Sequence, residues 1–122
     1  MRKSFRTALK RLAGRRQRRT TAADPYLATR KLIEIDAPTI FDVGANVGAT
    51  ALRYRELFPA AMIHCFEPYP PSFTSLRAAL SGDANTSLHP FALSSAAGRA
   101  SLQVNRNAET NSLLASDRRA ER

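Results

Sequence analysis

A short apolar run that ends in an acid and is followed by two spaced glycines constrains this chain most. The stretch is TIFDVGANVG at 39–48, and a segment with a helical pattern comes after it. This order is typical of a strand that turns tightly into a helix, because glycine lets backbone N–H groups approach a ligand closely. The positive end of the helix then points back at the turn. We therefore expect a ligand site at the carboxyl end of a parallel strand.

The glycine spacing alone leaves two interpretations open. The spacing of Gly44 and Gly48 is Gly-x-x-x-Gly, which differs from the Gly-x-Gly-x-x-Gly motif of dinucleotide-binding enzymes. Two glycines at this spacing also occur in a plain turn followed by a helix cap. A second apolar run ends in Glu67, 25 residues after Asp42. An acid at the tip of a second strand can accept hydrogen bonds from ribose hydroxyls. Together, the glycine turn and the second acid predict a nucleoside site.

The rest of the pattern predicts alternating helices and strands. We expect helices from 25 to 34 or 35, at 50–58 and from 70 to just before Gly82, and strands at 39–43, 61–66 and 87–93. Pro90 lacks the donor that a ladder needs, which favours the edge of a sheet for the third strand. That strand is an edge in the order 3-2-1-4-5. Ala97 and Gly98 then lead into an expected half-exposed strand or hairpin arm at 100–104.

These motifs resemble the FkbM family of methyltransferases. The resemblance rests on FDVGANVG at 41–48, FEP at 66–68, ALS at 92–94 with Gly98, and TNSL at 110–113. It implies the α/β, Rossmann-like class I methyltransferase fold and S-adenosyl-L-methionine as cofactor. It also implies methyl transfer to oxygen, with a hydroxyl of a small molecule or glycan as the expected acceptor.

The resemblance also implies roles for individual residues. Asp42 is expected to accept a hydrogen bond from the methionine ammonium of the cofactor, and Glu67 to hold its ribose. The adenine pocket is expected at the tip of the third strand, where ordinary core packing is the alternative. The expected cofactor-binding residues are Asp42, Gly44, Asn46, Gly48, Glu67, Ala92 and Leu93. No catalytic residue and no metal ligand is indicated, and both histidines are expected to be structural.

The length of the chain predicts a partial domain. A βαβ unit takes roughly 30 residues, so 122 residues hold about three such units beside the basic start. The family's later Asp-x-Glu-Gly strand, preceded by Lys, has no counterpart after Leu114. We expect a basic extension at 1–22, a partial FkbM-type domain at 23–114 and a polar tail at 115–122. A methyltransferase and a catalytically silent truncated fragment, which keeps only part of the cofactor-binding half, both remain open.

The net charge of +9 is concentrated at the amino terminus. Nine of the 19 Lys and Arg residues lie within 1–19, and the other ten balance the ten acids. Phe5, Leu9 and Leu12 follow a helical spacing there. A solvated extension, a weak contact with an anionic membrane surface or nucleic acid, and an organelle-targeting peptide are the three interpretations. No aromatic side chain follows Phe5 in this run, so no specific nucleic-acid partner is expected.

Cysteine content and hydropathy favour the cytoplasm. Cys65 is the one cysteine, so no disulfide can form within the chain, which fits a reducing compartment. Its apolar surroundings in the sequence predict a buried, inert thiol. No apolar stretch approaches the roughly 18 residues of a membrane span, and we expect no transmembrane segment.

Overall fold

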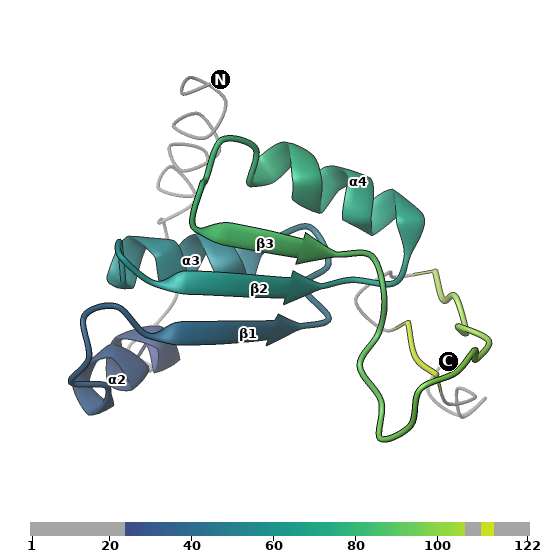
Figure 1. The fold of residues 1–122 in the computed structure, drawn as a ribbon, viewed down its shortest axis with the longest axis horizontal. Helices are drawn as coiled ribbons and strands as arrows, with labels where there is room; N and C mark the ends of the chain where they lie inside the picture. The colour runs from purple at the N-terminus through teal and green to yellow at the C-terminus, as the bar shows by residue number, and fades with distance from the viewer. Residues whose placement is uncertain (1–23, 107–110, 114–122) are drawn as a thin grey trace. The chain divides into compact units, whose positions relative to one another are not determined.

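The computed structural model describes residues 24–106 and 111–113, and it divides into one unit up to Ala92 and a second from Leu93. The first unit is α/β. Its elements, in chain order, are α2 (Pro25–Leu32), β1 (Thr39–Val43), α3 (Ala49–Leu57), β2 (Met62–Phe66), α4 (Pro70–Ala79) and β3 (Thr86–His89) (Figure 1). The predicted extension at 1–22 and tail at 115–122 lie outside the described residues.

The three strands form one parallel sheet in the order β1-β2-β3 (Figure 1). This order confirms the predicted neighbours of each strand and the edge position of the third strand, and it is compatible with a Rossmann-like fold. Asp42 pairs in register with Cys65, and Phe66 pairs with His89. The carboxyl ends of β1 and β2 therefore meet at one edge of the sheet.

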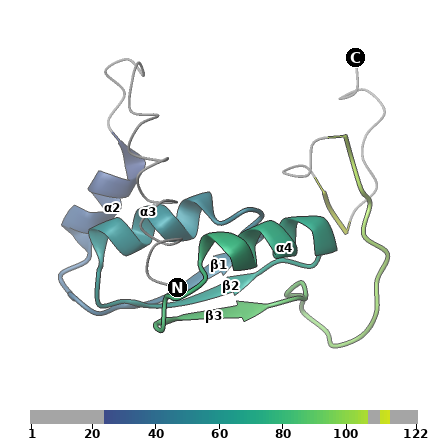
Figure 2. The same ribbon diagram turned by 90° about the horizontal axis from the view of Figure 1, so that it is seen from above.

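Helices α3 and α4 lie on the same side of the sheet (Figure 2). Their apolar side chains pack on the inward residues of the central strand, where Ile63 and Cys65 are fully buried. The rest of the buried core is Ala45, Ala51, Leu52, Phe58, Ala61, Leu76 and Leu80. Because the strand is central and parallel, its buried residues are those expected for a strand covered by crossover helices.

The predicted ends of α2 and β3 and the expected arm were wrong, each for a local reason, while the other predicted bounds lie within about two residues of the observed ones. Helix α2 ends at Leu32 because the backbone of Ile33 is extended. The Arg30 guanidinium stabilises this end of the helix by donating a hydrogen bond to the Ile33 carbonyl (2.9 Å). Strand β3 ends at His89, before Pro90, which cannot donate to the ladder. The expected arm at 100–104 is only one antiparallel bridge, between Gln103 and Ser112.

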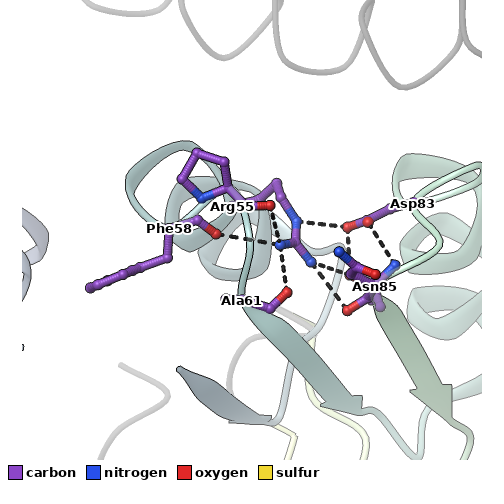
Figure 3. A network of polar contacts seen from close by, with 7 residues as sticks. Arg55, Phe58, Ala61, Asp83 and Asn85 are labelled. Carbon is purple, nitrogen blue, oxygen red and sulfur yellow. Dashed lines mark hydrogen bonds and ion pairs between the residues drawn. The ribbon is translucent and has the colours of Figure 1, made fainter. Parts of the chain in front are cut away.

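A buried arginine joins the turns at the amino ends of the strands (Figure 3). Arg55 on α3 is 8% exposed, and its Nε donates to the Asp83 carboxylate at 2.9 Å. One terminal nitrogen donates to the Ala61 carbonyl (2.6 Å), and the other donates to the Asn85 carbonyl (3.2 Å). It also donates to the carbonyls of Phe58 and Pro59 and to the Thr86 hydroxyl. The sequence analysis did not find this cluster.

Candidate ligand site at the carboxyl ends of β1 and β2

The turn between β1 and α3 has the left-handed backbone that its composition predicts. Gly44 has φ +77°, Asn46 φ +49° and Gly48 φ +90°. The N–H groups of Gly44 and Ala45 both donate to the carbonyl of Phe66, at 2.9 and 3.0 Å. The turn is therefore held against the end of β2. Asparagine tolerates the left-handed region better than other residues that carry a Cβ.

The two glycines of the motif have different surroundings. At Gly48, the residue that precedes α3, an added Cβ would lie 3.0 Å from Cδ1 of Leu76 on α4. Glycine is thus favoured at 48 by its positive φ, and a Cβ there would also require the Leu76 side chain to shift. At Gly44, an added Cβ would meet no atom within 4 Å. Gly44 faces open space, which leaves room for a ligand against the backbone.

Glu67 follows β2 directly and is 7% exposed. Its Oε2 accepts a hydrogen bond from the backbone N–H of Asn46 at 2.8 Å. Its Oε1 accepts from the N–H of Tyr69, the residue before α4, also at 2.8 Å. One carboxylate therefore connects the glycine turn to the start of the next helix. The turn and the second acid are therefore in direct contact, while the contact with ribose stays a prediction.

Two acceptor oxygens, one near the end of β1 and one in the turn, are buried without donors. Among the described residues, neither Oδ2 of Asp42 nor Oδ1 of Asn46 has a hydrogen-bond partner. Burial raises the pKa of the Asp42 carboxyl above its ordinary value, a hydrogen bond from the Ala51 backbone opposes this, and the nearby charge of Glu67 adds to the rise. Buried acceptors without donors are costly. Such acceptors suit a ligand that brings hydrogen-bond donors, and the carboxylate suits one that carries positive charge.

Ala92 and Leu93 lie beyond the end of β3. The expected strand at 87–93 would have carried both residues to its tip, but β3 is only Thr86–His89. Ala92 is half-buried at the end of the first unit, and Leu93 is 46% exposed at the start of the second. The structure therefore brings together Asp42, Gly44, Asn46, Gly48 and Glu67, and the adenine-pocket role of the other two stays a prediction.

A row of aromatic rings lies on the sheet, which the sequence analysis missed. Phe41 stacks on His64, with ring centroids 5.2 Å apart, and His89 stacks on Phe66 at 4.5 Å. The Nδ1 of His64 and the Nε2 of His89 are 3.3 Å apart. These residues are in register on neighbouring strands and alternate with the inward residues, so they share the face opposite the helices. Strand periodicity was the signal that could have revealed them.

The described part of the chain shows neither a reactive thiol nor a metal cluster. Burial raises the pKa of the Cys65 thiol to about 12, aided by the charges of Asp42 and Asp83 and opposed by Arg55. The thiol is therefore not a nucleophile at neutral pH. Within residues 24–106 and 111–113, no cluster of three or more His, Cys, Asp or Glu side chains suits a metal ion. No helix in the same ranges is long and apolar enough to cross a membrane.

Comparison with known proteins links this chain to a methyltransferase. No protein-family model and no solved structure matches it. One segment of 39 residues, 32% of the chain, is 46% identical to the 2-O-methyltransferase NoeI of Sinorhizobium fredii (strain NBRC 101917 / NGR234). That segment covers 16% of the relative's own length. Over this segment, the chain is similar to an enzyme that methylates oxygen.

Proposed function

We propose that this chain takes part in S-adenosyl-L-methionine-dependent methylation of a hydroxyl oxygen and that it belongs to the FkbM family. The observation that carries the proposal is the pair of buried acceptors without donors at Asp42 and Asn46. The similarity to a 2-O-methyltransferase supports both the reaction and the oxygen acceptor. The acceptor molecule that we propose is a small molecule or a glycan.

The residues of the turn fit the amino-acid end of this cofactor. An ammonium group donates several hydrogen bonds and carries positive charge, which matches the carboxylate of Asp42 and the amide oxygen of Asn46. Gly44 has no neighbouring atom where its Cβ would be, so the backbone there can be approached closely. The positive end of α3 opens on the same turn, and it favours a carboxylate there.

Glu67 fits the ribose of the cofactor. Each of its two oxygens accepts one backbone N–H, and a carboxylate oxygen has about two acceptor positions. One position on each oxygen is therefore left for a hydroxyl donor. The cofactor supplies an electrophilic methyl group on a sulfonium. The task of these side chains is to bind and orient it, because alignment of the reacting atoms lowers the barrier for such a transfer.

Isothermal titration calorimetry tests the proposal by measuring the affinity for S-adenosylhomocysteine of the unsubstituted chain and of an Asp42→Asn variant. Removing the charged acceptor should weaken binding roughly 10- to 150-fold, the range for a hydrogen bond to a charged group. Asp36→Asn is the matched control, because the Asp36 side chain is 89% exposed. Absence of binding by the unsubstituted chain, or equal affinity of the Asp42 variant, would contradict the proposal. A methyl-transfer assay on hydroxyl acceptors then separates an enzyme from a silent cofactor-binding fragment.

A further inference from the structure

We infer that Glu67 is a positioning residue that sets the affinity for the ammonium end of the ligand by acting through Asn46. The inference rests on the proposed function and adds to it a second role for this carboxylate. In the first role, Glu67 would contact only the ribose. In the second, it holds the backbone of Asn46 and so positions the Asn46 amide oxygen for the ammonium group.

The first step is the bond between Glu67 and the turn. Oε2 of Glu67 accepts the backbone N–H of Asn46 at 2.8 Å, and Glu67 is nearly buried. Asn46 has φ +49°, in the left-handed region, which asparagine tolerates better than other residues with a Cβ but which remains uncommon. The surroundings must therefore hold it there. The Glu67 carboxylate is the side chain that bonds the backbone N–H of this residue.

The second step is the consequence for the Asn46 side chain. The backbone of Asn46 fixes the direction in which its amide leaves the turn, and the amide oxygen is buried without a donor, as is Oδ2 of Asp42. If the Glu67 bond is lost, the strained backbone can relax and carry this oxygen away from its position. The site then keeps the Asp42 acceptor and loses the ordered Asn46 acceptor.

The third step is the anchor on the other side of the carboxylate. Oε1 accepts the N–H of Tyr69, which is the N-cap of α4 and has no side-chain cap of its own. Glu67 is thus fixed by α4 while it fixes the turn. Glutamine in its place has one oxygen acceptor and one NH₂ donor. In Glu67→Gln, the single amide oxygen can accept from the N–H of either Asn46 or Tyr69. The other N–H then faces the NH₂ group, which cannot accept its hydrogen bond.

The experiment compares two ligands on Glu67→Gln. S-Adenosylhomocysteine carries adenosine and an amino-acid group, whereas 5′-methylthioadenosine carries the adenosine alone. We expect the substitution to weaken S-adenosylhomocysteine roughly 2- to 10-fold more than 5′-methylthioadenosine, the range for one hydrogen bond. An equal loss for both ligands would assign Glu67 to the ribose alone and overturn the inference. Glu56→Gln, on the outer part of α3 and paired with Arg53, is the matched control.

Amide hydrogen exchange on the ligand-free chain gives an independent readout. In Glu67→Gln, the amide of Asn46 or Tyr69 should exchange faster, while that of Ile63, bonded to the Asn85 carbonyl inside the sheet, should keep its protection. Unchanged exchange at both Asn46 and Tyr69 would overturn the inference even if no ligand binds. A chain that binds neither ligand would contradict the proposed function. Faster exchange of the Asn46 or Tyr69 amide in that chain would still support the role of Glu67 in holding the turn.

Discussion

Gly48 and Leu76 approach each other so closely that a Cβ on the glycine would lie 3.0 Å from the leucine Cδ1. This contact brings α4 against the start of α3, beside the ligand turn. An alanine at this position would therefore meet the Leu76 side chain as well as the strain of a positive φ.

Gly48→Ala should consequently destabilise the protein more than Gly44→Ala. Both positions have positive φ, which costs alanine about 1–2 kcal/mol. At Gly48, the added Cβ also requires Leu76 to shift, and overpacking of this kind costs up to about 3 kcal/mol, while Gly44 has open space. Urea denaturation of the two variants measures the difference. Equal midpoints would show that the leucine moves aside without cost.

Asp42→Asn should raise the stability of the ligand-free protein at neutral pH. The folded-state pKa of Asp42 is raised, so folding favours its protonated form. The unfavourable contribution of the ionised carboxylate is therefore present at neutral pH and disappears as pH falls through the raised pKa. Denaturation at neutral pH and at pH 4 checks this: the gain from the substitution should shrink at the lower pH. A variant that is less stable at neutral pH would contradict the argument.

A fall in pH should weaken ligand binding, although it relieves the unfavourable charge of Asp42 in the ligand-free protein. Protonation removes the charge that the ammonium group needs, so binding of S-adenosylhomocysteine should weaken as pH falls through the raised pKa of Asp42. Titrations from pH 7 to pH 4 measure this effect. In Asp42→Asn the pH dependence should be smaller. A profile that the substitution leaves unchanged would assign the titration to another group.

Arg55→Met should cost about 3–5 kcal/mol of unfolding free energy, because it leaves the nearly buried Asp83 carboxylate without its positively charged partner. Arg53→Met is the matched control on the same helix. Arg53 pairs with Asp24 and Glu56 at the surface, and such pairs contribute about 0–1 kcal/mol. Thermal or urea unfolding compares the two. Similar losses would mean that other donors satisfy Asp83 and the carbonyls around it.

The face of the sheet opposite α3 and α4 should promote self-association of this chain. Phe41 is 61% exposed and Val43 is 58% exposed, and β1 pairs only with β2 within the described residues. An open strand edge beside exposed apolar side chains invites pairing with another chain. Phe41→Thr combined with Val43→Thr should therefore shift a sizing column toward the monomer. Leu32→Thr, on α2 and 84% exposed, should not. An unchanged profile for the double variant would exclude this face.

The sequence predicts the path of the chain better than its side-chain contacts. The apolar run before Asp42 and the helix-breaking residues around it are local signals, and β1 has the predicted bounds. Pro90 indicates an edge strand, but the expected strand runs to residue 93, whereas β3 ends at His89, immediately before the proline. Arg55 could not be found, because its partners are carbonyls and a carboxylate that meet only after two turns have folded. The Glu67 bond to Asn46 is hidden for the same reason.

The buried guanidinium of Arg55 has a consequence for how the domain unfolds. The same group bonds the turn that leads into β2 and the turn that leads into β3. If either turn opened alone, the charge would lose part of its partners while it stayed in the interior, which is expensive. Separate opening of either turn at the amino ends of β2 and β3 is therefore suppressed. The two βα units should unfold as a single cooperative unit. The ligand turn lies at the carboxyl ends of the strands and is held by its own bonds to Phe66 and Glu67, so its order does not depend on this guanidinium.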